Sequence, residues 1–318
     1  MQIWHKSNIR KVYSMGLYIN KAKENWVVDR FVNEWNLYNL KQDRTYFIGD
    51  KIIWLIAPWT WERIPKRTLK KNKVLCTIHH IDEGKFDSVE KLNFHNRDKY
   101  VDAYHVISNK TYEQVRGLTK KKIYRFPFWA NQNLWFFIKD KNKLRKKYNI
   151  GLDSFLVGSF QRDTEGSDLI SPKLSKGPDL FVEIVKHLND KHENLLVLLS
   201  GKRRQYVIKE LESIGIKYIY YEMVDFEALN ELYNLLNLYV VSSRYEGGPQ
   251  SIIECSLTRT PIISTDVGVA SEVLNEKSIF NMQNFQQAKP DVDFAEKNIQ
   301  HLMIPDGFRS FNEMFNEL

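Results

Sequence analysis

The sequence predicts an α/β fold built around two parallel sheets, and three observations support this prediction. Short apolar runs recur along the chain, separated by polar segments in which apolar residues return at helical spacing. The 318 residues are enough for two domains with separate cores. The hydrophobic content of 43% and the charged content of 27% are typical of globular proteins, and no low-complexity tract interrupts the sequence. We therefore expect the chain to be folded throughout.

Two series of predicted strands define the two sheets. Strands that alternate with helices form βα units and pair in parallel. The first series comprises residues 52–57, 74–79, 103–108 and 123–126, and the second comprises residues 154–160, 194–201, 217–224, 238–243 and 261–266. Helices are expected over residues 177–190, 203–215, 226–236, 249–259 and 308–318, the last of them amphipathic. Ligands of open parallel sheets bind beyond the carboxyl ends of the strands, so functional residues are sought there.

Charge is divided unevenly between the two halves of the chain. Residues 1–150 contain 31 Lys and Arg against 14 Asp and Glu, a net charge of +17, whereas the remainder has 16 against 25, a net charge of −9. Anionic lipid headgroups, a phosphate-bearing acceptor and simple solubility are three explanations that stay open. Nucleic acid is not an expected partner, because no recognised reading motif accompanies the charge.

The cellular location expected from the sequence is cytoplasmic, with peripheral contact between the basic N-terminal half and an anionic membrane as one open alternative. No apolar run is long enough for a signal-peptide core or a membrane span. Cys76 and Cys255 each lie in an apolar segment, so both are expected to be buried and reduced.

The strongest functional signal is the segment over residues 242–268. A predicted strand ends at Ser243, Gly247 and Gly248 form a turn, and Pro249 begins a helix. A free helix N-terminus presents unpaired N–H groups and a partial positive charge, which suits a diphosphate or a sugar hydroxyl. Glycines in the turn would let the ligand approach the backbone. The turn and the first helical residues, Gln250 and Ser251, are therefore predicted to line a phosphate-binding site.

Two glutamates flank this turn. Glu246 precedes it, and Glu254 lies within the helix, with seven residues between the two. Because carboxylates accept paired hydrogen bonds from vicinal hydroxyls, one could hold a sugar and the other a ribose, with the phosphates bound between them. This spacing predicts a site for a nucleotide-sugar.

The turn, the proline, both glutamates and the following PIISTDVG resemble the glutamate-x7-glutamate motif of retaining, family-4-type (group 1) glycosyltransferases. The resemblance implies the GT-B fold, with two Rossmann-like domains whose parallel sheets face an interdomain cleft. It implies an acceptor domain over residues 1–135, a nucleotide-sugar donor domain over residues 136–300, and a C-terminal helix over residues 301–318 that packs back toward the N-terminal domain. In that family Glu246 would face the donor sugar and Glu254 would hold the ribose.

The resemblance assigns further donor-site residues. KGPDLFVEIV is similar to the family's lysine-glycine segment, so Lys176 is expected to contact the diphosphate. The family places an arginine after the first strand of the donor domain; here Ser159 directly follows Gly158 in that strand, and Arg162 is the nearest arginine, before an apparent insertion. Backbone at Tyr221 and Met223 would receive the base. The adjacent Arg203 and Arg204 could also reach phosphate, although a solvated position is the favoured interpretation for both.

On the acceptor side, VLCTIHHIDEGKF is similar to the family's threonine-x-histidine element, which places His79 near the transferred sugar, with His80, Asp82 and Lys85 as weaker candidates. The first loop departs from the family because it lacks the usual Gly-Gly pair. Asn25, Trp26 and Asp29 could line an acceptor pocket there, and a core position for Trp26 is equally consistent with the sequence.

The reaction that the resemblance implies is transfer of a sugar, with retention, to a glycan, lipid-linked or other acceptor. His79, Glu246, Lys176 and Arg162 would be the catalytic residues, with the cations stabilising the leaving diphosphate. No metal and no other cofactor is expected, since Asp291 and Asp293 lie away from the strand ends. The alternatives are a nucleotide-sugar epimerase or sugar phosphorylase of the same fold, and a non-catalytic protein that binds a sugar nucleotide or glycan.

Overall fold

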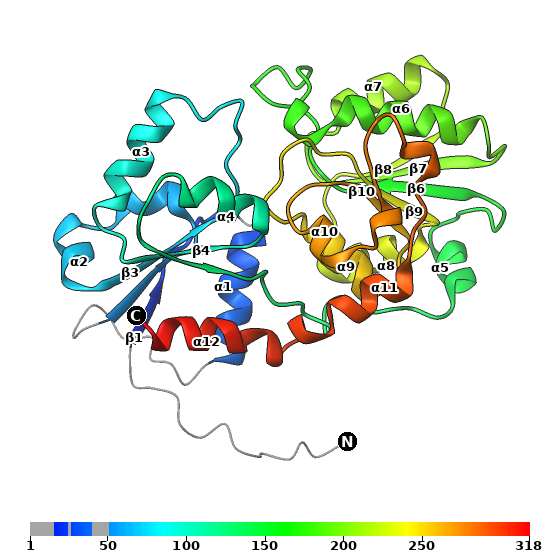
Figure 1. Cartoon of the computed structure of the whole chain (residues 1–318). Helices are drawn as coiled ribbons and strands as arrows, with labels where there is room; N and C mark the ends of the chain where they lie inside the picture. Colours follow the sequence, from blue (N-terminus) through cyan, green and yellow to red (C-terminus); the bar gives the residue numbers. More distant parts are fainter. Residues whose placement is uncertain (1–15, 25–26, 40–50) are drawn as a thin grey trace, which may run out of the picture.

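The computed structural model describes residues 16–24, 27–39 and 51–318. Two parallel sheets, each covered by helices, lie side by side (Figure 1). The first has the strand order β1-β2-β3-β4-β5, and the second has the order β11-β10-β9-β6-β7-β8. The predicted fold class, α/β with two Rossmann-like domains, is confirmed.

The first sheet contains the four predicted strands and one more. All its pairings are parallel, and the predicted ends differ from the observed ones by at most two residues. The additional strand at the edge was missed, because its four residues are short of a recognisable period and only partly buried. The strands are β1 (Gly16–Ile19), β2 (Lys51–Leu55), β3 (Lys73–Ile78), β4 (Ala103–Val106) and β5 (Lys122–Arg125).

The second sheet contains the five predicted strands and a short edge strand. The order reverses between β6 and β9, which pair in parallel, so residues that follow these two strands lie at a topological switch point. The strands are β6 (Phe155–Ser159), β7 (Leu195–Ser200), β8 (Tyr218–Tyr221), β9 (Leu238–Val241), β10 (Ile262–Thr265) and β11 (Ile279–Phe280).

Helices begin at recognisable capping residues. The side chain of Asp87 accepts hydrogen bonds from the N–H groups of Val89 and Glu90, and Asp225 caps its helix in the same way. The first domain has α1 (Val27–Tyr38), α2 (Lys66–Lys71), α3 (Ser88–Asp98) and α4 (Asn109–Arg116). The second has α5 (Lys141–Lys147), α6 (Pro178–Asn189), α7 (Gln205–Ser213), α8 (Phe226–Leu235), α9 (Gln250–Thr258), α10 (Ala270–Val273) and α11 (Val292–Asn298).

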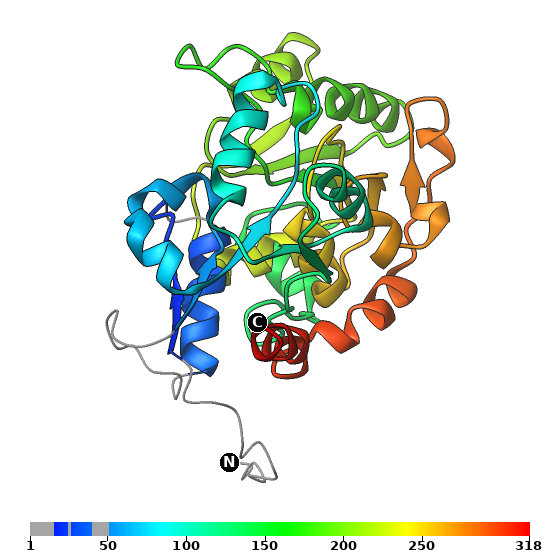
Figure 2. The same cartoon turned by 60° about the vertical axis from the view of Figure 1, so that its left-hand side comes forward.

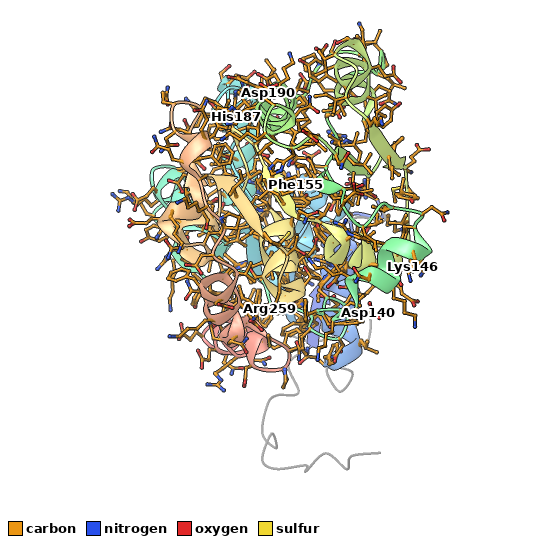
Figure 3. The ribbon with its side chains drawn as sticks, turned by 90° about the vertical axis from the view of Figure 1, so that its right-hand side faces the viewer. Asp140, Lys146, Phe155, His187, Asp190 and Arg259 are labelled. Carbon is orange, nitrogen blue, oxygen red and sulfur yellow. The ribbon has the colours of Figure 1, made fainter. Side chains whose placement is uncertain are left out.

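Short 3-10 helices connect several of these elements. They are η1 (Pro58–Arg63), η2 (Leu174–Lys176), η3 (Glu276–Ser278), η4 (Phe285–Gln287), η5 (Gln300–Leu302) and η6 (Asp306–Phe308). The predicted helix over residues 203–215 starts two residues later than expected, because Arg203 has a left-handed φ of 65° and Arg204 is the N-cap of α7. Figure 3 shows Asp140 and Lys146 at the two ends of α5, on the outer side of the second domain.

The last helix, α12 (Arg309–Asn316), returns to the first domain (Figures 1 and 2). Its apolar residues join the core cluster that contains residues of α1 and β2. Trp35 of α1 packs edge-on against Phe315, with 5.4 Å between ring centroids, and Trp54 of β2 lies 5.4 Å from Phe311. Aromatic contacts of this kind fix the C-terminal helix against the first sheet.

Cys76 and Cys255 are both buried and free, as expected. Within the described ranges, no helix has the length and apolar character needed to cross a bilayer. Location in the cytoplasm stays a prediction.

Candidate functional site

The turn that carries the glutamate pair lies where β9 ends. Ser242 and Ser243 follow the strand and are fully buried, and Pro249 is the N-cap of α9. The observed helix therefore starts one residue after the predicted first position. This arrangement places the α9 N-terminus beyond the carboxyl end of a central strand, beside the switch point of the sheet.

Gly247 and Gly248 form the direct contact between the turn and the first domain. A Cβ atom added at Gly247 would lie 1.6 Å from the carbonyl oxygen of His79, and one added at Gly248 would lie 2.9 Å from Ile107. Glycine is required at Gly247 because the backbones of the two domains meet there, whereas the neighbour of Gly248 is the end of the Ile107 side chain. Access of a ligand to this backbone stays a prediction.

Glu246 pairs with Lys176. The ammonium group forms a short ion pair with Oε1 of the carboxylate, and the two side chains are 12% and 20% exposed. The hydroxyl of Ser243 donates to the same oxygen at 3.3 Å. The backbone beside Lys176 is fixed because Gly177 packs on the carbonyl of Ser242, where a Cβ atom would approach to 1.8 Å. The structure thus brings two of the predicted catalytic residues together.

Glu254 lies in α9 and is buried between the two domains. Its Oε1 accepts a hydrogen bond at 2.7 Å from Arg30 of α1, and its Oε2 accepts one at 2.7 Å from the hydroxyl of Tyr233 in α8. Arg30 comes from a segment to which the sequence assigned no element. The pair spans 224 residues of sequence, so no local pattern signals it.

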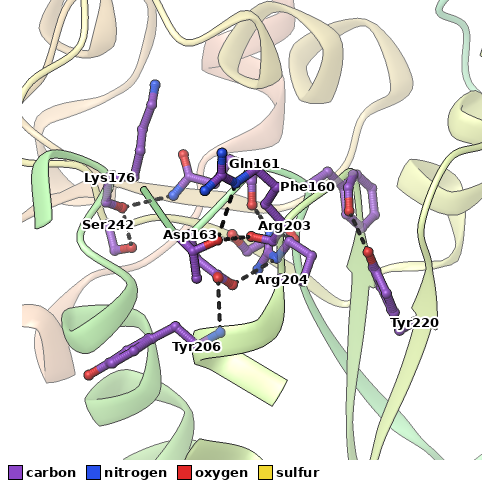
Figure 4. Close-up of polar contacts among 12 residues, drawn as sticks. Phe160, Gln161, Asp163, Lys176, Arg203, Arg204, Tyr206, Tyr220 and Ser242 are labelled. Atoms are coloured by element: carbon purple, nitrogen blue, oxygen red, sulfur yellow. Dashed lines mark hydrogen bonds and ion pairs between the residues drawn. The ribbon is translucent and has the colours of Figure 1, made fainter. Parts of the chain in front are cut away.

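A buried ion pair fixes the loop that follows β6 (Figure 4). Arg204 Nε lies 3.1 Å from Asp163 Oδ2, and the two side chains are 1% and 2% exposed. Arg204 also donates to the carbonyl oxygens of Ser159 and Gln161. The favoured prediction of a solvated Arg204 was therefore wrong. The ion pair with Asp163 offsets the cost of desolvating the buried guanidinium.

Arg162 follows this anchored backbone and is partly buried. Lys173, which sequence reasoning missed, lies in the same loop. Burial, followed by the charges of Arg162, Lys176 and Lys85, lowers the pKa of Lys173 to about 8. Like charges that crowd together lower one another's pKa, and such a group attracts an anion. The only sequence signal for Lys173 was its position three residues before Lys176.

His79 and His80 face the second domain from the end of β3. His79 Nε2 donates to the carbonyl oxygen of Ile56 at 2.8 Å, and burial lowers the pKa of His79 to about 4, so its ring is neutral at pH 7. Desolvation also lowers the pKa of His80, and Glu246 and Lys176 act on it electrostatically. The predicted histidine element is thus next to the Glu246 and Lys176 pair.

Other predicted donor-site residues occupy more varied positions. Gly158 lies within β6, and a Cβ atom there would approach Leu236 to 2.5 Å, which gives the glycine a packing role. Tyr221 ends β8, and Met223 beyond it is 61% exposed. Gln250 and Ser251 start α9, and Gln250 Oε1 accepts from Arg30 at 3.1 Å. Contacts of all these residues with a donor stay predictions.

The weaker acceptor-side candidates are only partly described. Asn25 and Trp26 lie outside the described residues. Asp29 accepts hydrogen bonds from the N–H groups of Lys23 and Glu24, so it shapes the loop before α1. Lys85 pairs with Glu165 at 2.8 Å across the two domains, and Asp82 caps the turn at Gly84.

Asp291 and Asp293 have cationic partners. Asp291 pairs with Lys277 at 2.8 Å and caps α11, and Asp293 pairs at 2.6 Å with Arg259, which Figure 3 shows near α11. Among the residues that the structure describes, no group of three or more His, Cys, Asp and Glu side chains is arranged to hold a metal ion.

Two solved structures share this fold over most of the chain. HepE of Anabaena, solved with UDP and glucose, matches with a TM-score of 0.71 at 10% identity, over 96% of this chain and 100% of that one. Sucrose-phosphate synthase from Thermosynechococcus elongatus matches with a TM-score of 0.66 at 17% identity, over 91% and 76%. At these identities the likeness shows the fold alone, and that fold is GT-B.

Sequence comparison supplies the family. Residues 171–303 match the model of the Glycosyl transferases group 1 family. The O-antigen biosynthesis glycosyltransferase WclY of Escherichia coli is 24% identical over 168 residues, which are 51% of this chain. The match spans 43% of that relative's own length. The predicted resemblance to group 1 glycosyltransferases is therefore confirmed, whereas the family-4 assignment and retention of configuration stay predictions.

Proposed function

We propose that this protein transfers a sugar from a nucleotide-sugar donor to a glycan, lipid-linked or other acceptor with retention of configuration. The observation that carries the proposal is the Glu246 and Lys176 ion pair, set beside the α9 N-terminus and facing His79 and His80 of the other domain. The complexes of HepE with UDP and glucose and with UDP-glucose support a nucleotide-sugar as the donor.

Charge stabilisation is the main catalytic effect in this proposal. As the bond between sugar and phosphate breaks, negative charge builds on the leaving diphosphate. Lys176, Arg162 and Lys173 would stabilise it together with the α9 N–H groups, as fixed donors in a desolvated site. Lys176 has three N–H donors, so it can contact phosphate while it stays paired with Glu246. No metal is required by this scheme.

We assign the remaining roles to the two glutamates and to His79. Glu246 would accept hydrogen bonds from the donor sugar, and Glu254 from the ribose. His79 is neutral and commits Nε2–H to Ile56, so only Nδ1 is left to accept a hydrogen bond. It would therefore position a hydroxyl group of the transferred sugar and would not act as an acid.

A donor screen tests the proposal. UDP-, GDP-, ADP- and CMP-linked sugars are added in turn and thermal unfolding is followed. The true donor is expected to raise apparent stability by about 2.7 kcal/mol at about 100 times its Kd, and to be consumed in the presence of acceptor. Binding without turnover of any donor would favour a sugar-nucleotide-binding protein, and activity with a sugar phosphate and free phosphate would favour a phosphorylase.

We also propose that the first domain contacts an anionic membrane. The basic residues of α2 are exposed, and Val89 and Leu92 of α3 are each 60% accessible. Figure 1 shows α2 and α3 in the same outer part of the first domain. Basic residues near an anionic surface contribute about 1 kcal/mol each. The basic residues are Lys66, Arg67, Lys70 and Lys71.

Cosedimentation with phosphatidylserine-containing vesicles is expected to be strong, to weaken as salt rises, and to fall in the Lys70→Glu, Lys71→Glu double variant. A matched double variant in the second domain, Lys186→Glu with Lys191→Glu, controls for the change in net charge. Equal binding by the two double variants, or binding that salt does not change, would refute the proposed membrane face.

A further inference from the structure

Arg30 joins the first domain to the predicted ribose-binding residue of the second. It lies on α1, which Figure 1 shows between the first sheet and the helices of the second domain, and it is 9% exposed. Nη1 donates to Glu254 Oε1 at 2.7 Å and Nη2 donates to Gln250 Oε1 at 3.1 Å. Both partners lie on α9, so one guanidinium fixes the side chains of its first two turns.

Arg30 and Tyr233 cover the carboxylate that a ribose would have to reach. A carboxylate that grips a ribose accepts from two vicinal hydroxyls, one on each oxygen or both on one. In Glu254, Oε1 already accepts from Arg30 and Oε2 from Tyr233, and the side chain is 8% exposed. A ribose can therefore reach this carboxylate only if at least one of the present partners moves.

Three aromatic rings surround the guanidinium of Arg30. Its guanidinium carbon lies 5.4 Å from the Trp135 ring, 5.4 Å from Phe31 and 5.9 Å from Phe226. Phe226 begins α8, directly after the residues that follow β8. Aromatic faces stabilise a cation that has lost most of its water, and the same faces suit a base or ribose.

Arg30 has a second carboxylate within reach. Its Nε lies 4.0 Å from Glu34 Oε1, one turn along α1, and within the described part of the chain this buried Nε has no hydrogen-bond partner. Glu34 is itself fixed, because Trp129 Nε1 donates to it at 2.7 Å and Asn131 at 2.9 Å. A buried guanidinium must stay paired, and Glu34 allows it to leave Glu254 and remain so.

We propose that Arg30 and the donor ribose compete for the carboxylate of Glu254, and that Arg30 pairs with Glu34 while the ribose is bound. This inference rests on the proposed function, since it takes Glu254 as the ribose ligand. Arg30 is then a residue that sets donor affinity, and it couples the contact between the two domains to the presence of the nucleotide.

Substitutions of Arg30 and Glu34 are expected to change the affinity for the nucleoside diphosphate in opposite directions. Calorimetric titrations with UDP, GDP and ADP compare the wild type with Arg30→Met and Glu34→Gln. Arg30→Met, which removes the competing guanidinium, is expected to tighten binding about tenfold for the diphosphate that binds the wild type. This is a usual size for coupling between sites. Glu34→Gln, which removes the alternative carboxylate, is expected to weaken binding of that diphosphate several-fold. Arg30→Met also leaves Glu254 buried without a cation, so its melting temperature is expected to fall and its rise on adding the diphosphate to be larger than in the wild type.

Three controls separate the causes. The 2′,3′-dideoxy form of the same diphosphate lacks the competing hydroxyls, so Arg30→Met is expected to leave its affinity unchanged. Arg125→Met removes another ion pair between the domains, to Glu272 at 3.5 Å, and is expected to leave donor affinity unchanged. If Arg30→Met proves too unstable to titrate, Arg30→Lys keeps the charge but loses the two-pronged contact, and it is expected to tighten binding by a smaller factor.

The outcomes distinguish this inference from the proposed function. If no diphosphate binds the wild type, or if Glu254→Ala leaves affinity unchanged, the ribose role of Glu254 fails and the proposed function is in question. If Glu254→Ala weakens binding while Arg30→Met and Arg30→Lys do not tighten it, the competition alone is refuted. Tightening by Arg125→Met as well would show that any loosening of the interface has this effect, and would also overturn the inference.

Discussion

Lys176→Ala is expected to lower turnover about 100-fold or more, the order found when one fixed donor that stabilises a developing negative charge is removed. Lys176 pairs with Glu246, and the backbone of Gly177 is locked against Ser242, so the ammonium group is held in place before any substrate arrives. Preorganised charge of this kind costs no rearrangement during the reaction. The substitution removes the charge and leaves Glu246 without its cation.

Initial rates of donor consumption at saturating donor measure this effect, with the melting temperature recorded for each variant. Lys186→Ala, on the exposed face of α6, removes the same charge at a distance from the site and is expected to keep wild-type turnover. Lys176→Arg is expected to retain part of the activity, since it keeps a cation on a differently shaped side chain. Near-normal turnover of Lys176→Ala would reject the assignment.

Gly247→Ala is expected to abolish most of the activity through the contact between the domains. The added methyl group would lie 1.6 Å from the His79 carbonyl oxygen and 2.5 Å from its carbon, and neither backbone can yield without separating the turn from β3. Because a displacement of about 1 Å at a catalytic site costs about 100-fold in rate, we expect a loss of at least that order. The core clusters of each domain do not include this contact, so both domains should stay folded.

Rates, small-angle scattering and hydrogen exchange at the end of β3 test this prediction together. The expected result is lower activity, a larger radius of gyration and faster exchange near His79. Gly117→Ala is the matched control, because Gly117 has an ordinary φ of −75° and the nearest atom to an added Cβ is 3.6 Å away. Wild-type activity and dimensions in Gly247→Ala would show that the close approach is not needed.

The local pattern of apolar and polar residues was sufficient to predict most of the fold. Nine of the eleven strands in the described part of the chain follow from short apolar runs, because buried strands of parallel sheets carry apolar residues on both faces. The turn around Glu246 was found because its glycines, its proline and its spacing lie within one short segment. Glu246 and Lys176 were each found in a separate motif that the family resemblance connected, but their ion pair was not predicted.

The first strand and first helix were not predicted. β1 is an edge strand with partly exposed residues, so it lacks the continuous apolar run of the central strands. α1 buries Phe31, Val32 and Trp35 against a cluster that includes residues of α12, almost 300 residues further along the chain. Its apolar residues recur at helical spacing, so the helix itself could have been predicted, whereas its distant packing partners have no local signal.

The amino-acid sequence by itself determined the two α/β sheets, the glycine turn after β9 and the residue types that a nucleotide-sugar site requires. Only the tertiary structure decided which charges pair. Arg204 is buried because Asp163 lies beside it, and Glu254 meets Arg30 because α1 packs against α9. Desolvation of a charge depends on everything that surrounds it, and those surroundings exist only once distant segments have packed together.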